Sequence, residues 1–447
     1  MKKEGTNKPK VVIIGGGFGG LEAAKALKDK PVEVTLVDKK NHHTFQPLLY
    51  QVATAVLSPG QIASPIRRIL RRAPNVEVLL GEVTGFDLDR RTVLLKDDLS
   101  IDFDYLIVAA GARHAYFGHD EWENDAPGLK TIEDALEIRR RVLLAFELAE
   151  RDAMRKGTHE PLNFVVIGGG ATGVELAGAI AGIARQALAK DFKAIDTRSA
   201  KVMLLEGADR ILNSYSEKLS ERARKDLEDL GVEVRLNSFV TDIRPGEVKV
   251  GDEWIDSSVV VWASGVAASP LGAMLGAETD RAGRVLVDDD LSVKGRPNVF
   301  VIGDMARVEN EDGSLVPGVA PAAMQMAWSA AKNILGDIRG EARTPFRYKD
   351  KGSMATIGRN KAIVEVGRFK MGGFLAWMAW LVLHIVMLIG FRNRLFVLSE
   401  WIWAYFTRER TARLITGDAE DLKDALQFIT AKPGRAESEK ASRSKVA

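Results

Sequence analysis

The sequence contains the same glycine-rich turn twice, each time between a short apolar run and a segment with helical character. The first copy, Gly15-Gly16-Gly17-Phe18-Gly19-Gly20, follows the β-branched run 10–14. In this GxGxxG pattern the first glycine permits a tight turn, the second lets a pyrophosphate approach the backbone, and the third lets helix pack on strand. The phosphates then meet free N–H groups at the positive end of the helix. The pattern predicts an α/β fold that binds a dinucleotide.

An acidic residue strengthens this interpretation of the first turn. Asp38 ends the next expected strand, 32–37, and lies 18 residues beyond Gly20. A carboxylate at that place accepts hydrogen bonds from the ribose hydroxyls of an adenosine. A glycine-rich turn alone also serves as a plain tight connection. The strand before it, the helix after it and the acid at this distance together favour a nucleotide site.

The second copy, Gly168-Gly169-Gly170-Ala171-Thr172-Gly173, follows the run 163–167. Its acid, Glu206, ends the strand expected at 201–205 and lies 33 residues beyond Gly173, more than the usual distance of about 20. We attribute the extra length to a helix that extends over 177–192. Because a carboxylate at the ribose repels a 2′-phosphate, this copy is expected to prefer NADH to NADPH.

Composition sets outer limits on the function. With 447 residues the chain is too long for one ordinary core, and its net charge of +2 gives no reason to expect nucleic-acid binding. The chain has no cysteine, which excludes disulfides, iron–sulfur clusters and a cysteine nucleophile. Residues 1–10 are polar and contain no signal-peptide core, so the catalytic body is expected in the cytoplasm.

Two dinucleotide folds in tandem resemble the flavoprotein superfamily with two dinucleotide-binding domains. Residues 103–111 and 298–304 are similar to two further superfamily segments, and the second of these places Asp304 against the ribityl chain of the flavin. The resemblance implies two Rossmann-like domains, the second inserted in the first, followed by a C-terminal amphipathic helical region that anchors the protein to a membrane. The expected boundaries are 1–120 and 285–340 for the FAD-binding domain, 121–284 for the NADH-binding domain, 341–430 for the membrane-anchoring module and 431–447 for a disordered tail.

Within that superfamily, residues 9–417 resemble the type II NADH dehydrogenases, which are single-chain NADH:quinone oxidoreductases that pump no protons. The segments 41–53, 260–266 and 318–325 carry this resemblance. It implies that the first domain binds FAD and the second binds NADH. The FAD contacts implied are Gly15, Gly16, Gly17, Phe18, Gly19, Gly20, Asp38, Lys39, Val83, Ala110, Gly111, Asp304, Ala322 and Ala323. The NADH contacts implied are Gly168, Gly170, Thr172, Gly173, Glu206 and Gly265.

One motif departs from the family. Where the family has two glutamines in its quinone pocket, this chain has Pro321 at the first position and Gln325 at the second. Proline donates no hydrogen bond to a quinone carbonyl. We therefore expect Gln325 to contribute to quinone binding, together with backbone groups or another side chain. The departure bears on which quinone is used more than on the class of reaction.

The absence of cysteine also excludes some of the enzyme groups that are related to this family and leaves others possible. Glutathione and lipoamide reductases and sulfide:quinone reductases depend on cysteines, so they are excluded. Reductases that serve a ferredoxin-like or rubredoxin-like protein carrier need no thiol, and they form the alternative enzyme hypothesis. A non-enzymatic redox sensor in which FAD is structural is a third hypothesis.

The apolar stretch 374–391 distinguishes these hypotheses. It is interrupted only by His384, and four of the eight tryptophans lie between Trp377 and Trp403. A buried core helix, a spanning helix and an interfacial anchor all fit such a stretch, since its eighteen residues are at the lower limit for crossing a bilayer. Tryptophan and arginine favour the anchor, with its apolar face in lipid and its arginines at the headgroups. The arginines are Arg392, Arg394, Arg408, Arg410 and Arg413.

The residues also indicate how the chemistry is divided. The flavin carries the redox steps, so neither a metal nor a protein nucleophile is expected. Glu175, just after Gly173, is the candidate catalytic residue, and a helix-start acid stabilised by the dipole is an equally weighted alternative. His42, His43 and His384 are expected to be structural. The expected location is the cytoplasmic face of the cell membrane, as a monotopic protein, and the family suggests a homodimer.

Overall fold

The computed structural model describes residues 8–417. Within this range the chain forms two compact units. Unit 1 comprises 8–44, 63–113 and 266–351, and unit 2 comprises 45–62, 114–265 and 352–417. The chain passes from unit 1 to unit 2 between residues 113 and 114, and it returns between residues 265 and 266. The domain boundaries expected from the sequence were 120/121 and 284/285. The second difference arises because α8 (Leu271–Met274) packs on β6 (Val83–Asp87) of unit 1.

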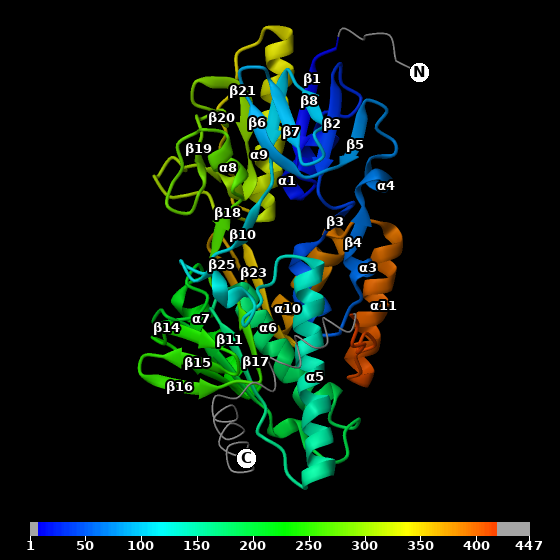
Figure 1. The fold of residues 1–447 in the computed structure, drawn as a ribbon, viewed down its shortest axis with the longest axis vertical. Coiled ribbons are helices and arrows are strands. Elements are labelled where there is room, and N and C mark those ends of the chain that lie inside the picture. Colours follow the sequence, from blue (N-terminus) through cyan, green and yellow to red (C-terminus); the bar gives the residue numbers. More distant parts are fainter. Residues whose placement is uncertain (1–7, 418–447) are drawn as a thin grey trace, which may run out of the picture. The chain divides into compact units, whose positions relative to one another are not determined.

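Unit 1 is built on a six-stranded sheet with β1 near its centre (Figure 1). Neighbouring strands are parallel, except for the antiparallel pair of β20 and β21. In spatial order the strands are β20 (Ser292–Val293), β21 (Arg296–Val301), β9 (Tyr105–Val108), β1 (Lys10–Ile14), β2 (Glu33–Asp38) and β5 (Val76–Leu80). Strand β2, which follows β1 in the sequence, lies on one side of β1 in the sheet, and the later strand β9 lies on the other side. Ligands bind at the carboxyl ends of strands where the order reverses in this way.

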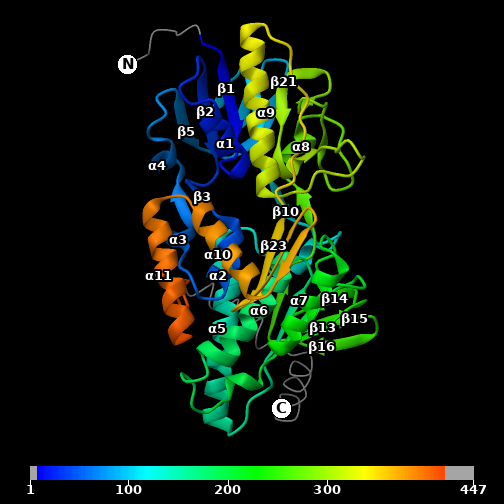
Figure 2. The ribbon, with the colours of Figure 1, turned by 180° about the vertical axis from the view of Figure 1, so that it is seen from behind.

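Helices cover this sheet, and the small strands of unit 1 form separate sheets beside it. Helices α1 (Phe18–Ala26) and α9 (Ala320–Arg339) pack against each other (Figure 2). The apolar run of β1 is buried, as its β-branched residues predict for a central parallel strand. The remaining elements of unit 1 are β3 (His42–Thr44), β4 (Ala63–Pro65), α4 (Ile66–Leu70), β7 (Thr92–Leu95), β8 (Ser100–Asp102), β18 (Val266–Ala268), β19 (Val285–Leu286) and β22 (Ala306–Arg307).

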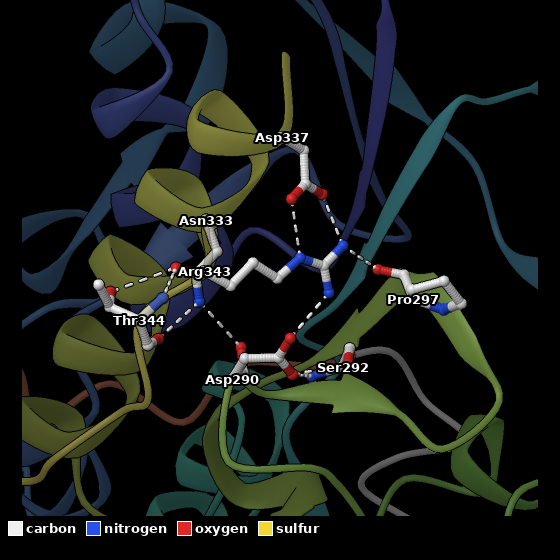
Figure 3. Close-up of polar contacts among 7 residues, drawn as sticks. All are labelled: Asp290, Ser292, Pro297, Asn333, Asp337, Arg343 and Thr344. Atoms are coloured by element: carbon white, nitrogen blue, oxygen red, sulfur yellow. Dashed lines mark hydrogen bonds and ion pairs between the residues drawn. The ribbon is translucent and has the colours of Figure 1, made fainter. Parts of the chain in front are cut away.

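A polar cluster around Arg343 fixes the C-terminal end of α9 to the sheet (Figure 3). The Arg343 guanidinium donates to both carboxylate oxygens of Asp337, at 2.9 and 2.6 Å, and to Asp290 at 2.8 Å. These two acids raise the pKa of Arg343. Arg343 also donates to the carbonyl oxygen of Pro297 at 2.6 Å, and its guanidinium lies over the ring of Phe300, 5.0 Å from the centroid. Because Arg343 joins α9 to the β20–β21 hairpin, it also fixes the axis of the helix that carries Ala322, Ala323 and Gln325.

Unit 2 repeats the same plan on a four-stranded parallel sheet. In spatial order its strands are β13 (Val232–Arg235), β12 (Lys201–Leu205), β11 (Asn163–Ile167) and β17 (Val259–Trp262). The order again reverses beside the first strand, β11. The helices and the antiparallel strands of this unit are α2 (Leu49–Ala53), α3 (Pro59–Ile62), α5 (Ile132–Lys156), α6 (Ala171–Gly182), α7 (Glu217–Asp229), β14 (Val240–Arg244), β15 (Glu247–Val250) and β16 (Glu253–Asp256).

The helix expected over 177–192 is shorter than predicted. It ends as a π-helical turn, Ile183–Ala187. The segment that follows is drawn into other hydrogen bonds, because the Glu150 carboxylate on α5 accepts from the N–H groups of Lys193, Ala194 and Ile195. The extra length before Glu206 is therefore part helix and part loop.

The C-terminal part of unit 2 begins with the antiparallel strands β23 (Ser353–Gly358), β24 (Lys361–Val366) and β25 (Phe369–Gly372). Two helices follow, α10 (Phe374–Met387) and α11 (Phe391–Thr407). Leu388 is extended and Gly390 has a φ of +94°, so the apolar stretch is divided between two helices. Among residues 8–417, no helix combines the length and the apolarity needed to cross a bilayer. The spanning interpretation is wrong for the described chain, and the expected tail at 431–447 lies outside the described residues.

The two helices are not core helices of this chain either. Of the residues of α10, only Ala376 and Trp380 are buried, and α11 buries only Val397. Large apolar side chains on both helices are exposed, with Leu375 at 67%, Phe391 at 75% and Phe406 at 78%. A core helix would have these side chains covered. The structure therefore leaves an apolar surface on α10 and α11.

Candidate functional site: two nucleotide cradles and an aromatic pocket

The first glycine turn joins β1 to α1 in unit 1. Gly15 has a φ of +98°, a conformation that favours glycine. A Cβ on Gly20 would lie 1.8 Å from the carbonyl oxygen of Gly15, so this position admits no side chain. A Cβ on Gly17 would instead meet nothing within 4 Å. The outer glycines thus close the turn, and the middle one faces open space at the start of the helix, where a pyrophosphate fits.

We call each glycine-rich turn, together with the acid at the end of the following strand, a cradle. Asp38 is the acid of the first cradle. One oxygen of its carboxylate accepts a hydrogen bond from the N–H of Gly16 at 2.5 Å, and the other accepts from the N–H of Lys40 at 2.6 Å. Nδ1 of His43 donates to the carbonyl oxygen of Gly16 at 3.0 Å, and its ring contacts Phe18 edge-on at 5.0 Å. Burial lowers the pKa of His43. His43 therefore supports the turn, in line with the structural role expected for it.

The other residues expected to contact FAD come from the carboxyl ends of neighbouring strands. Gly15 lies against Ala109 and Ala110, which follow β9, and Gly19 lies against Ile302 and Ala323. Gly303, with Asp304 in the same turn Gly303–Met305, approaches Ala323. The N–H of Gly81 donates to the carbonyl oxygen of Asp38 at 2.9 Å, which brings the segment leading to Val83 beside the acid. Unit 1 thus places most of the expected FAD contacts around one cradle.

Four of these residues have more limited roles. The N–H groups of Ala322 and Ala323 both donate to the carbonyl oxygen of Val319, at 3.0 and 3.1 Å, and are not free to bind a ligand. Lys39 is exposed beyond Asp38. Gly111 has a φ of +68° and open space around its Cα, so it shapes the turn after β9.

The second glycine turn, in unit 2, repeats this geometry. Gly168 has a φ of +107°, and a Cβ on Gly173 would again lie 1.8 Å from the first glycine's carbonyl oxygen. A Cβ on Gly170 would meet nothing within 4 Å. The Glu206 carboxylate accepts from the N–H of Gly169 at 2.5 Å and from that of Ala208 at 2.8 Å. Glu206 therefore takes the place that Asp38 has in unit 1, despite its longer separation in sequence.

The remaining residues expected to contact NADH lie at the rim of this turn. Thr172 is exposed at the start of α6. Gly265 has a φ of +81°, and a Cβ there would meet the ring of Phe117 at 2.5 Å. Glycine is thus required at 265 by the backbone conformation and by the adjacent aromatic ring.

A pocket of about 530 Å³ opens beside α6, within unit 2. Glu175 is one of its lining residues. It is the fifth residue of α6 rather than part of the first turn, so the helix dipole acts on it less than expected. Its carboxylate accepts a weak hydrogen bond from the N–H of Thr356 at 3.4 Å. Burial raises the pKa of Glu175 to about 8, so the protonated and ionised forms both occur near neutral pH.

This pocket is completed by Tyr50 and Gln51, which were not identified individually from the sequence, and by Arg410, which was expected at the lipid headgroups instead. Gln51 donates to the hydroxyl of Tyr50 at 2.8 Å and accepts from the indole N–H of Trp401 at 2.7 Å. Arg410 donates to the carbonyl oxygens of Thr54 at 2.6 Å and Ala179 at 2.9 Å. Burial raises the pKa of Tyr50 and lowers that of Arg410 to about 10. One signal was available: Gln51 is a polar residue in the apolar segment Leu48–Ala53.

The remaining candidates make hydrogen bonds of their own within their units. Gln325, in unit 1, bonds through both side-chain heteroatoms to the backbone of Lys349, each at 3.0 Å. His384 stacks on Trp380 at 4.0 Å and donates to its carbonyl oxygen at 2.7 Å, which supports a structural role. Quinone binding by Gln325 stays a prediction, and it requires the amide to exchange its bonds with Lys349.

Known proteins have similar sequences and a similar fold. The pyridine nucleotide-disulphide oxidoreductase model matches residues 9–327, and the NDH2 C-terminal domain model matches 351–409. The chain is 48% identical over 424 residues to the type II NADH:quinone oxidoreductase NdhA of Mycobacterium tuberculosis, covering 91% of this chain and 89% of the relative. For Ndh of the same organism, also a type II NADH:quinone oxidoreductase, the identity is 45% over 448 residues, covering 97% and 96%. The structure of NDH2 from Plasmodium falciparum in complex with NADH has a similar fold, with a TM-score of 0.82 and 20% identity over 92% of this chain and 100% of that one.

Proposed function

Since this chain belongs to the type II NADH:quinone oxidoreductases, we propose that it oxidises NADH and reduces a membrane quinone without pumping protons. The duplicated cradle carries this proposal, because the two turns give the chain separate seats for two dinucleotides. When bound, FAD supplies the two-electron redox chemistry that links NADH oxidation to quinone reduction. The protein's part is to bind, to orient and to exclude water.

Unit 1 is the FAD-binding unit in this proposal, and unit 2 binds NADH. In unit 1, the middle glycine Gly17 admits the pyrophosphate, Asp38 accepts from the adenosine ribose, and Asp304 accepts from the ribityl chain. In unit 2, Gly170 and Glu206 take the corresponding parts. The Glu206 carboxylate disfavours a 2′-phosphate through like-charge repulsion, which gives NADH the advantage over NADPH.

Glu175 is the candidate proton-handling residue of the aromatic pocket. Its pKa of about 8 lets it hold a proton at neutral pH and release it to a group that needs one. Quinone reduction consumes two protons, and a carboxyl group of this kind is suited to supply one of them and to take up another from solvent before it supplies the second. Gln325 remains the proposed contact to the quinone head group, with the backbone of its segment.

The apolar surface of α10 and α11 is the proposed membrane anchor. Leu375, Phe391 and Phe406 are exposed in a part of the chain that carries no acid in α10 and one in α11. A helix pair of this kind lies in the interface of a bilayer with its apolar face among the acyl chains. We place it on the cytoplasmic face of the cell membrane, where a hydrophobic quinone reaches the enzyme from lipid.

The arginines that flank this surface have different roles. Arg394 donates to the carbonyl oxygens of Leu388 and Val386, at 2.8 and 2.7 Å, and so closes the C-terminal end of α10. Arg413 pairs with Asp191. With Arg410 also bonded to backbone carbonyls, Arg392 and Arg408 remain as exposed candidates for the lipid headgroups.

Acceptor specificity tests the function. The FAD-loaded protein is given NADH and, in parallel, a soluble quinone analogue or a ferredoxin-like protein. We expect sustained NADH oxidation with the quinone and none above background with the carrier. Turnover with the carrier alone would replace the quinone assignment with that of a carrier reductase.

Vesicle flotation tests the anchor. Replacing Leu375 and Phe391 by glutamate removes apolar area and adds charge at the acyl boundary, so most binding to vesicles with anionic lipid should be lost. The matched control is Leu99→Glu, at an exposed leucine (53%) of unit 1, which should bind as the wild type does. Unchanged flotation of the double variant would show that α10 and α11 are not the anchor.

A further inference from the structure

Phe239 is a large apolar side chain exposed beside the acid of the second cradle. Its exposed fraction is 71%, although its neighbour Val240 is buried in the apolar cluster of unit 2. Side chains alternate along a strand, so with Val240 directed into the core its predecessor faces outward. The fold accounts for the direction of this side chain. It does not account for a phenylalanine at an exposed position.

Backbone hydrogen bonds hold Phe239 at this place. The N–H of Ser238 donates to the carbonyl oxygen of Glu206 at 2.8 Å, and the N–H of Asn237 donates to that of Ala208 at 2.9 Å. Asn237 has a φ of +51°, a left-handed conformation that asparagine adopts more readily than most residues. The segment is therefore clamped to 206–208, which fixes the backbone that carries the ring relative to Glu206.

The ring lies on a glycine. A Cβ on Gly207 would be 3.0 Å from Cδ2 of Phe239 and 3.6 Å from Cε2. A side chain at 207 would press against the ring or displace it. Gly207 follows Glu206 directly, so the sequence leaves a flat aromatic surface next to the carboxylate that is proposed to bind a ribose.

The first cradle has no aromatic counterpart. There the N–H of Gly81 donates to the carbonyl oxygen of Asp38, as that of Ser238 does to Glu206. The residue that follows Gly81 is Glu82, where unit 2 has Phe239. An exposed aromatic residue at this place is thus particular to the second cradle and does not belong to the shared turn.

We propose that Phe239 is the stacking platform for the adenine ring of NADH. This inference rests on the proposed function, in which the second cradle binds NADH with its adenosine ribose at Glu206. Adenine is attached to that ribose and presents a flat π face, which stacks favourably on an aromatic side chain. Phe239 then sets affinity for the adenosine half of the dinucleotide and leaves the nicotinamide half unaffected.

Calorimetry of ligand fragments tests this role without turnover. FAD-loaded protein is titrated with a non-reducing tetrahydro analogue of NADH, with ADP-ribose and with nicotinamide mononucleotide. In Phe239→Ala we expect the dissociation constants of the first two ligands to rise about 5- to 30-fold. That of the mononucleotide should not change. Phe239→Trp should retain binding, and Met154→Ala, at another exposed apolar residue (76%) of unit 2, is the matched control.

The possible results distinguish a failure of this inference from a failure of the proposed function on which it rests. If wild type binds ADP-ribose and Phe239→Ala binds it equally well, Phe239 is no platform and the NADH assignment still holds. Equal losses for ADP-ribose and the mononucleotide would show a general disturbance of the unit, which also overturns the inference. If FAD-loaded wild type binds neither the analogue nor ADP-ribose, the second cradle is not an NADH site and both statements fail.

Discussion

The two cradles have the same backbone conformation and differ in the groups that surround the turn. Gly15 and Gly168 have φ angles of +98° and +107°, and each third glycine of the motif lies equally close to the first. Around this frame, the carbonyl oxygen of Gly16 accepts from the His43 side chain, whereas that of Gly169 accepts from the N–H of Leu212. In the proposed function, the glycines allow a pyrophosphate to bind, and the residues beyond the turn set which nucleotide each cradle takes.

The largest effect is expected when the third glycine of either cradle is replaced by alanine. In Gly20→Ala and in Gly173→Ala, the new Cβ meets a backbone oxygen at 1.8 Å, so each should lose roughly 3–4 kcal/mol of unfolding free energy. The two variants should differ in colour. Gly20→Ala should purify without flavin, and Gly173→Ala should stay yellow while NADH no longer bleaches it.

Denaturant unfolding and the flavin absorbance of the purified proteins provide the measurement. Gly85→Ala is the control, since a Cβ there makes only an ordinary contact at 3.7 Å. If both variants lost flavin to the same extent, the assignment of one dinucleotide to each cradle would be wrong.

A smaller effect is expected at the acids. Glu206→Gln removes the charge that repels a 2′-phosphate and keeps an oxygen that can accept from Gly169. The preference for NADH over NADPH, measured as the ratio of kcat/KM values, should therefore fall about tenfold, or roughly 1.4 kcal/mol.

Asp38→Asn serves as the comparison in unit 1. It should lower FAD retention and leave the NADH/NADPH ratio unchanged. A ratio that responds to Asp38 and not to Glu206 would reverse the assignment of the cradles.

The smallest effect is expected at Glu175, whose counterpart by position in the first cradle, Glu22, pairs with Lys25 at 2.6 Å. Its ordinary pKa is 4.5 and burial raises it to about 8 in the folded chain, so folding binds a proton between these values. The stability present below pH 4.5 is lost as pH rises through about 8. Relative to Glu175→Gln, the Tm of wild type should therefore fall by at least about 2 °C over this range.

Turnover separates the two roles of this residue. If Glu175 relays protons, the Gln variant should lose the pH dependence of kcat near pH 8, and the exposed helix-start variant Glu217→Gln should keep it. Unchanged turnover and quinone affinity, with only the stability altered, would leave Glu175 a structural residue.

The sequence predicted the features that rest on local rules. The strands at 163–167 and 201–205 were expected at the residues where they occur, because short apolar runs that end at a glycine turn or at an acid have few alternatives. The acids Asp38 and Glu206 were also identified, although the latter lay at an unusual distance. Local pattern could not predict the end of the helix after Gly173, because the Glu150 carboxylate that captures the following N–H groups comes from another helix.

The aromatic pocket shows the limit of such prediction. Tyr50, Thr356 and Arg410 come from three distant segments, and their approach depends on how α6 meets β23. A Cβ on Gly178 would lie 1.9 Å from the carbonyl oxygen of Ile357, so one glycine permits that approach. Glycine spacing alone does not reveal such a contact in a helix rich in small residues. The division of the apolar stretch at Leu388 was missed for a related reason, since hydropathy does not record a change of backbone direction.

Anaerobic double-mixing stopped-flow spectroscopy tests the central claim most directly. The purified yellow protein is mixed with NADH and then with a soluble quinone, and the flavin absorbance is followed throughout. Two cradles that bind different dinucleotides predict rapid bleaching by NADH and full recovery of the colour on addition of quinone. A bound flavin that NADH leaves oxidised would contradict the account.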